Sequence, residues 1–182
     1  SKGYIFLLIK VYVRVIGFDV IRSLGICDVL FIFGAIGMVA GSVNAMRAKT
    51  TRMMVAYSSV AQIGYIFAAL GLGNELGMLC ALWHMLAHSA TKSMLFISAH
   101  TLDHASGDTH LRKDLRGGFY RSPLAAAAFT LGAANLVGVP MLSVFVTKVT
   151  MAQAAVMTGG RLLVGKTAMQ GVTLALAGEE NV

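Results

Sequence analysis

Charged residues are scarce in this sequence: they make up 13% of its 182 residues, whereas soluble domains carry about a quarter. Apolar side chains take their place at 57% of the composition, and the mean hydropathy is +0.73. This combination excludes an ordinary soluble domain. The sequence therefore predicts an integral membrane protein.

Cysteines and cofactor motifs are also rare or missing. The only two cysteines, Cys27 and Cys80, lie in or beside apolar segments, and we interpret them as packed thiols without a disulfide. Apolar segments recur along the whole chain, so a targeting peptide does not explain the composition. The sequence has no Gly-rich phosphate loop, C-x-x-C pair or haem-binding pair, and we expect no cofactor.

Basic residues outnumber acidic ones, which gives a net charge of +7 and a pI near 9.7. Such a balance could indicate binding to nucleic acid. The basic residues, however, fall in short connections between apolar segments rather than along a soluble face. Membrane topology explains them more simply, so we expect a lipid bilayer and no nucleic acid as the partner.

Three uncharged runs cover residues 29–46, 53–74 and 122–147. Each approaches or exceeds the roughly 18 to 20 residues that cross a bilayer as a helix. We therefore expect an all-α, polytopic transmembrane bundle of about five to six helices. The expected helices cover residues 2–16, 26–46, 53–73, 76–100, 122–156 and the segment from residue 162.

One of these helices should be discontinuous, because Gly138 and Pro140 lie near the middle of residues 122–156. Proline removes a backbone donor and clashes with the preceding turn, and irregular backbone survives in a membrane only when protein or a wet cavity surrounds it. The first and last helices are short. We interpret residues 1–182 as a single transmembrane region that is truncated at both ends.

The basic side chains are concentrated in alternate connections. The positive-inside rule therefore places residues 47–52 and 101–121 on the cytoplasmic side, in what we expect to be a bacterial inner (plasma) membrane. The basic residues of these two connections are Arg47, Lys49, Arg52, Arg112, Lys113, Arg116 and Arg121.

Three protonatable residues recur at four-residue intervals in "LWHMLAHSATKSMLF": His84, His88 and Lys92. On a helix they form one stripe over two turns. A charged residue at the centre of a membrane helix costs roughly 2.5 to 3.5 kcal/mol, and such residues usually mark ion or proton pathways. We interpret the stripe as a candidate proton pathway, because histidine titrates near neutral pH.

Two other interpretations of the stripe stay open. The histidines could simply be hydrogen-bonded while the lysine extends toward the membrane interface. Alternatively, the H-x-x-x-H spacing could supply two metal ligands, with His104, Asp108 and His110 as further candidates. No spacing here completes a recognised metal site, so we expect no bound metal.

Further polar residues lie in the other apolar segments. Lys148 follows Pro140 by eight residues, and Lys2 lies at the start of another apolar run. Ser58, Gln62 and Tyr65 share one helical face, where interhelical hydrogen bonding is their expected role.

Three segments together resemble a known family. They are "RMMVAYSSVAQIGYIFAALGLG", "LWHMLAHSATKSMLFISAH" and "LRKDLRGGFYRSPLAAAAFTLGAANLVGVPMLSVFVTK". In this order they resemble the antiporter-like membrane protein shared by respiratory complex I, Mrp-type cation/proton antiporters and membrane-bound hydrogenases. The resemblance covers residues 1 to about 154 and implies most of the second of two inverted repeats.

The resemblance also implies a role for individual residues. The family's proton relay contains a central lysine, a helix with histidines and a lysine, and a lysine beside a broken helix. The central lysine matches Lys2, and the lysine beside the broken helix matches Lys148. The residues of the histidine and lysine helix match His84, His88 and Lys92. At two positions the sequence departs from the family pattern, because Val144 replaces a usual glycine and Met141 a common proline. We expect a helix break that is stiffer or differently shaped.

The expected function is proton translocation through this lysine and histidine relay, within a multisubunit NADH:quinone oxidoreductase-type or Mrp-type complex. Other membrane subunits are the expected partners, and this chain would carry no redox site of its own. Two alternatives remain, a Na⁺/H⁺ exchange module and a truncated fragment without function.

Overall fold

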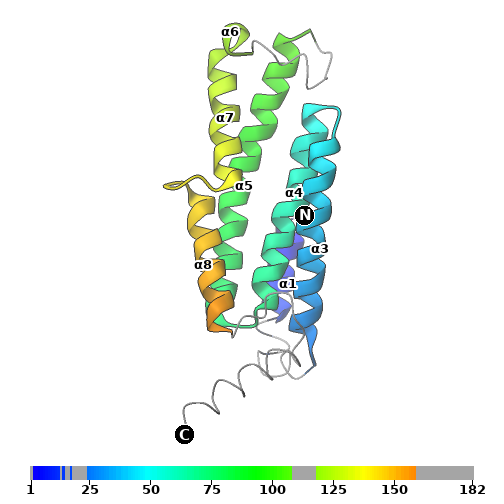
Figure 1. The fold of residues 1–182 in the computed structure, drawn as a ribbon, viewed down its shortest axis with the longest axis vertical. Coiled ribbons are helices and arrows are strands. Elements are labelled where there is room, and N and C mark those ends of the chain that lie inside the picture. Colours follow the sequence, from blue (N-terminus) through cyan, green and yellow to red (C-terminus); the bar gives the residue numbers. More distant parts are fainter. Residues whose placement is uncertain (1, 13, 15–16, 18–23, 108–117, 159–182) are drawn as a thin grey trace, which may run out of the picture.

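In the computed structural model, the residues described are 2–12, 14, 17, 24–107 and 118–158 (Figure 1). Every secondary-structure element of this part of the chain is a helix, as the sequence predicts. The helices are α1 (Lys2–Val11), α3 (Ile26–Arg47), α4 (Thr51–Gly71), α5 (Glu75–Ala105), α6 (Gly118–Arg121), α7 (Pro123–Val137) and α8 (Ser143–Met157).

The helices form an elongated bundle in which α4 and α5 occupy the middle (Figure 1). Helix α3 packs on α4, and α4 packs on α5. On the far side of α5, α7 and α8 lie end to end along its length (Figure 1). A broken helix thus runs beside the long, continuous α5.

Side-chain caps fix where the central helices begin. Thr50 accepts a hydrogen bond from the backbone N–H of Met53 at 3.2 Å, and Asn74 accepts one from Gly77 at 2.6 Å. Each cap satisfies an orphan donor of the first turn. The Asn74 amide also donates to the carbonyl of Ala154 at 2.9 Å, so it ties the end of α8 to the start of α5.

Small residues bring α3 and α4 into close contact. A Cβ atom added to Gly34 would clash with the backbone nitrogen of Ala68, and one added to Gly41 would clash with that of Ala61. Helices without side chains at such positions can approach closely over their full length, which is the packing that small residues favour in membranes. The outer face of α3 carries exposed apolar side chains, among them Ile32, Phe33 and Ile36.

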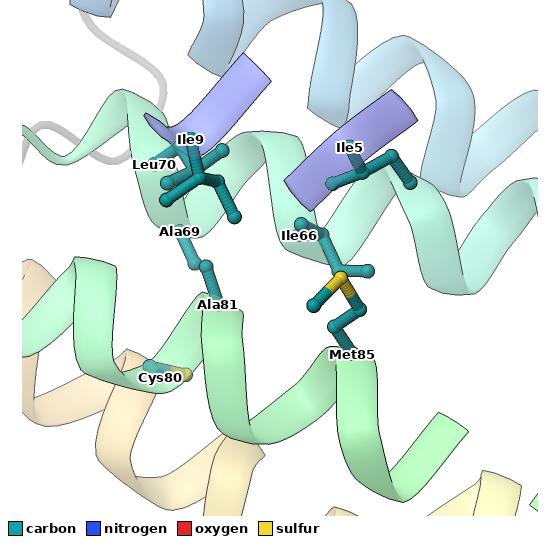
Figure 2. Packing of buried hydrophobic residues seen from close by; sticks show 8 residues of the cluster. All are labelled: Ile5, Ile9, Ile66, Ala69, Leu70, Cys80, Ala81 and Met85. Carbon is teal, nitrogen blue, oxygen red and sulfur yellow. The ribbon is translucent and has the colours of Figure 1, made fainter. Parts of the chain in front are cut away.

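Helix α1 packs across the lower part of the bundle. Ile5 and Ile9 are buried against Ile66 and Leu70 of α4 and Met85 of α5 (Figure 2). Both cysteines are buried and free, which confirms their interpretation as packed thiols.

By length and composition, α3 and α4 could each cross a membrane. Helix α5 is longer, at 31 residues, but it carries the histidines and the lysine. Helices α7 and α8 have 15 residues each, so neither spans a bilayer alone.

Several helix boundaries differ from the predicted ones. The helix predicted at 76–100 continues to Ala105, and the α-helix predicted at 2–16 ends at Val11. The break predicted within residues 122–156 is found between Val137 and Ser143, and this interruption contains Gly138 and Pro140. The helix predicted from residue 162 lies outside the described residues.

Candidate functional site

The polar stripe of α5 faces the interior of the bundle. His84, His88 and Lys92 are each only 2 to 3% exposed. Their four-residue spacing keeps them on the side of α5 that faces its neighbours. The rings of His84 and His88 are nearly parallel, with an interplanar angle of 9° and centroids 6.4 Å apart.

The ammonium group of Lys92 is held by α4. Its Nζ donates to the carbonyl of Val55 at 2.6 Å and to the hydroxyl of Ser58 at 2.5 Å. The side chain therefore folds into the bundle instead of extending along α5 toward an exposed end. Both of these partners are neutral oxygens.

A cavity of about 480 Å³ lies beside the stripe. It is an open pocket that borders both His88 and Lys92. A water molecule occupies about 30 Å³ in the liquid, so the space would accommodate several waters next to these two groups. The other lining residues are Ser59, Ile63, Ser93, Phe96 and Ile97.

His84 is held on both sides. Its Nε2 lies 2.9 Å from the side-chain oxygen of Gln62 on α4, and its Nδ1 lies 2.8 Å from the hydroxyl of Thr147 on α8. The ring of Tyr65 packs against the imidazole at a centroid distance of 5.8 Å. Three helices thus contribute to the surroundings of one buried imidazole.

Lys148 lies on α8 and reaches back across the helix break. Its Nζ donates to the carbonyls of Leu136 at 3.2 Å and Val137 at 2.8 Å, at the end of α7. The last carbonyls of a helix have no partner within it, and a cation satisfies and stabilises them. The ammonium also lies 5.2 Å from the ring centroid of Tyr65.

The break itself depends on two residues with left-handed backbone. Gly138 ends α7 with φ of 89°, a conformation that glycine adopts without strain. Met141 has φ of 75°, which costs a residue with a side chain about 1 to 2 kcal/mol. The Met141 side chain is almost fully exposed, so packing of this side chain does not offset the cost of its backbone conformation.

Asn135 bridges the break, and the sequence patterns did not single it out. Its side-chain oxygen accepts from the backbone N–H of Val144, which caps the start of α8, at 3.1 Å. Its side-chain nitrogen donates to Thr91 of α5 at 2.7 Å. An amide three residues before Gly138 in an otherwise apolar run is the signal that could have found it.

The predicted residues form one row of polar side chains, the file, which is buried at His84, His88 and Lys92 and half-buried at Lys148. The Gln62 amide nitrogen donates to the carbonyl of Leu136 at 3.5 Å, and the same carbonyl accepts from Lys148. The members of the file are Lys148, Gln62, His84, His88 and Lys92 with Ser58. The side chain of Lys2 lies outside the described residues, although its backbone begins α1.

Arg52, at the start of α4, lies beside the end of α5. Arg52 forms a salt bridge with the buried Asp103 at 3.2 Å and contacts Nδ1 of His100 at 2.8 Å. Among the residues that the structure describes, no three His, Cys, Asp or Glu side chains could share a metal ion. Asp108 and His110 lie outside this part of the chain.

Comparison with known proteins identifies relatives of two kinds. The chain is 37% identical over 123 residues to the NADH-quinone oxidoreductase subunit N of Desulforudis audaxviator. It is 31% identical over 115 residues to a probable K⁺/H⁺ antiporter subunit of Rhizobium meliloti, and 31% identical over 131 residues to the chloroplastic NAD(P)H-quinone oxidoreductase subunit 5 of Lemna minor.

These matches cover 66%, 63% and 68% of the chain, respectively, but only 24%, 11% and 17% of the relatives. No solved structure matches the chain significantly. The family model described as "NADH:quinone oxidoreductase/Mrp antiporter, TM" matches residues 5–173. The chain therefore belongs to the NADH:quinone oxidoreductase/Mrp antiporter family of transmembrane proteins.

Proposed function

We propose that the chain is a membrane-spanning part of a proton-translocating protein, and that Lys148, His84, His88 and Lys92 form its proton relay. The observation that carries this proposal is the buried row of titratable groups His84, His88 and Lys92 on α5, with the half-buried Lys148 of α8 at its end. Buried charges of this kind are expensive and usually mark a pathway. Lys2, which matches the central lysine of the family's relay, is proposed as a further member.

The hydrogen bonds of the two lysines suit proton transfer. A charged lysine has three N–H donors, and its neutral amine keeps two. Lys92 needs two donors for Val55 and Ser58, and Lys148 needs two for Leu136 and Val137. Each lysine can therefore lose a proton and still donate to both of these partners.

We further propose that residues 1–182 form a single transmembrane region within a multisubunit complex of the NADH:quinone oxidoreductase or Mrp type. Other membrane subunits would be its partners, and any redox chemistry would belong to them. The end that contains residues 47–52 and 101–121 would face the cytoplasm, across what we expect to be the inner membrane of a bacterium. A cysteine placed at Lys49 should then resist an impermeant thiol reagent added outside intact cells. Strong labelling would show that this end of the bundle faces outward, opposite to the proposed orientation.

Substitution of Lys92 tests the relay. In membranes that contain the chain with its native partners, Lys92→Ala should lower proton flux about ten-fold or more, because a titrating group is lost. The matched control is Lys10→Ala, since Lys10 is an exposed lysine on α1. Wild-type flux in Lys92→Ala at an equal protein level would leave Lys92 a structural role only.

Cation/proton exchange is a second candidate function, because one relative is named as a K⁺/H⁺ antiporter subunit. The same membranes distinguish the two functions. Exchange requires that adding Na⁺ or K⁺ to one side collapses a preformed pH gradient. A redox-coupled pump instead builds the gradient when electron donor is supplied.

A further inference from the structure

We propose that Gln62 and Thr147 hold His84 in one tautomer, with the permanent proton on Nε2, and that proton exchange occurs at Nδ1 alone. Thr147 is then a positioning residue whose hydroxyl turns when the charge on His84 changes. The relay role of His84 rests on the proposed function. The tautomer assignment rests on the hydrogen bonds alone.

The orientation of the Gln62 amide decides where the permanent proton lies. The amide nitrogen donates a long hydrogen bond, 3.5 Å, to the carbonyl of Leu136, which can only accept, and this contact assigns the atom as the NH₂ group. The amide oxygen then faces His84 at 2.9 Å and also can only accept. The Nε2 atom must therefore carry a hydrogen, whether the imidazole is neutral or charged.

The other ring nitrogen faces a group that can both donate and accept. The Thr147 hydroxyl lies 2.8 Å from Nδ1 of His84 and 2.8 Å from the carbonyl of Val144. A hydroxyl has one hydrogen, so it donates to only one of these two at a time. When His84 is neutral, Nδ1 is a lone pair and receives the hydroxyl hydrogen.

Uptake of a proton reverses this arrangement. We take Lys148 of the relay as the donor: one N–H bond of its ammonium breaks and leaves a neutral amine, and the proton adds to the Nδ1 lone pair, which forms an imidazolium and breaks no bond in the ring. The new Nδ1–H donates to the Thr147 oxygen, and the hydroxyl hydrogen turns to the carbonyl of Val144. Release of the same proton from Nδ1 restores the first state.

The remaining neighbours of His84 do not compete for its nitrogens. Tyr65 of α4 and His88 of α5 meet the imidazole through their rings, at centroid distances of 5.8 and 6.4 Å. Cys80 of α5 directs its thiol to the backbone carbonyl of Thr147 at 3.0 Å. Lys148 of α8 directs its ammonium to the end of α7.

Two consequences follow for the relay. His84 stores a proton on one side of its ring and does not pass it through from one nitrogen to the other, because Nε2 is occupied in both states. The moving hydroxyl also reaches Val144, in the first turn of α8 and directly after the helix break. The charge of His84 is thereby linked to the hydrogen bonding of α8.

The test is nitrogen NMR of the histidine rings in the membrane-embedded complex, labelled with ¹⁵N-histidine. Subtracting the spectrum of a His84→Gln variant identifies the resonances of His84. At about pH 9, well above the ordinary histidine pKa of about 6.5, the ring should be neutral. We expect a protonated Nε2 and an unprotonated, hydrogen-bonded Nδ1.

Three variants separate the contributions. Thr147→Val should move the Nδ1 resonance downfield, because the hydrogen bond to it is lost, whereas Thr147→Ser should preserve it. Gln62→Leu should produce a mixture of both tautomers. Thr150→Val is the matched control, since the Thr150 hydroxyl also bonds a carbonyl of its own helix, that of Val146 at 2.8 Å.

A protonated Nδ1 with a bare Nε2 in the wild-type protein would overturn the proposal without need of any variant. An Nδ1 resonance unchanged by Thr147→Val would overturn the role of Thr147. The spectra are recorded at equilibrium and need no transport. If Lys92→Ala has wild-type flux while the predicted tautomer is found, the relay fails and the tautomer assignment stands.

Discussion

The two sides of α4 are packed by opposite means. Toward α3, contact is made by small residues such as Gly34 and Gly41, against Ala68 and Ala61, and backbones meet directly. Toward α5, contact is made through polar side chains, with Gln62 bonded to His84 and Ser58 to Lys92. One helix thus has an apolar, closely packed face and a hydrogen-bonded face.

The two faces of α4 have different roles: the face toward α3 supports the fold, and the face toward α5 carries part of the candidate site. At Gly34 and Gly41 the backbones of α3 and α4 pack directly, because an added Cβ would clash with main-chain atoms of α4. A hydroxyl, an amide or an ammonium can exchange partners and protons without moving its helix. We infer that α3 and α4 provide a rigid support, and that changes of charge take place on the side of α5, α7 and α8.

The largest effect is expected on the rigid side. Gly34→Val should prevent the close approach of α3 and α4 and lower the amount of assembled protein to about a tenth or less, because overpacking costs about 1 to 3 kcal/mol. Gly37→Ala on the same helix is the control, since its nearest neighbour would lie at an ordinary 3.5 Å. Native gels of solubilised membranes measure the amount of assembled protein for both variants. Normal assembly of Gly34→Val would show that the interface between α3 and α4 tolerates a larger side chain.

A smaller effect is expected at the helix break. Asn135→Ala removes the cap of α8 and the bond to Thr91, which should cost about 1 kcal/mol. In a chain of this size that corresponds to a fall of about 2 to 4 °C in the unfolding temperature. The control is Asn44→Ala on α3, because the exposed Asn44 amide bonds only a carbonyl of its own helix. Equal unfolding temperatures for the two variants would mean that the cap does not support the break.

Much of the fold could be predicted from the sequence. The length of the uncharged runs placed α3 and α4 to within a few residues, because a helix that crosses a bilayer has a fixed minimum length. The four-residue spacing placed His84, His88 and Lys92 on one face. Gly138 and Pro140 indicated the break, because both act on the local backbone.

The partners across the break could not be predicted in the same way. Asn135 and Thr147 look like ordinary residues of apolar helices, and their importance depends on how α7 and α8 are placed beside α5. The contact of Lys148 with the last carbonyls of α7 depends on the left-handed residues Gly138 and Met141. Sequence spacing gives neighbours within one helix, but it does not give contacts between two helices joined by an irregular connection.

The most direct test of the central claim, that the file from Lys148 to Lys92 moves protons, is the proton flux of Lys148→Arg in membranes that contain the complex. Arginine keeps the positive charge and can still donate to the carbonyls of Leu136 and Val137, but it does not lose its proton in a protein. The account predicts an assembled complex with flux reduced about ten-fold or more. Wild-type flux in the arginine variant would contradict it, because Lys148 would then be a fixed cap of α7 and the relay would not include it.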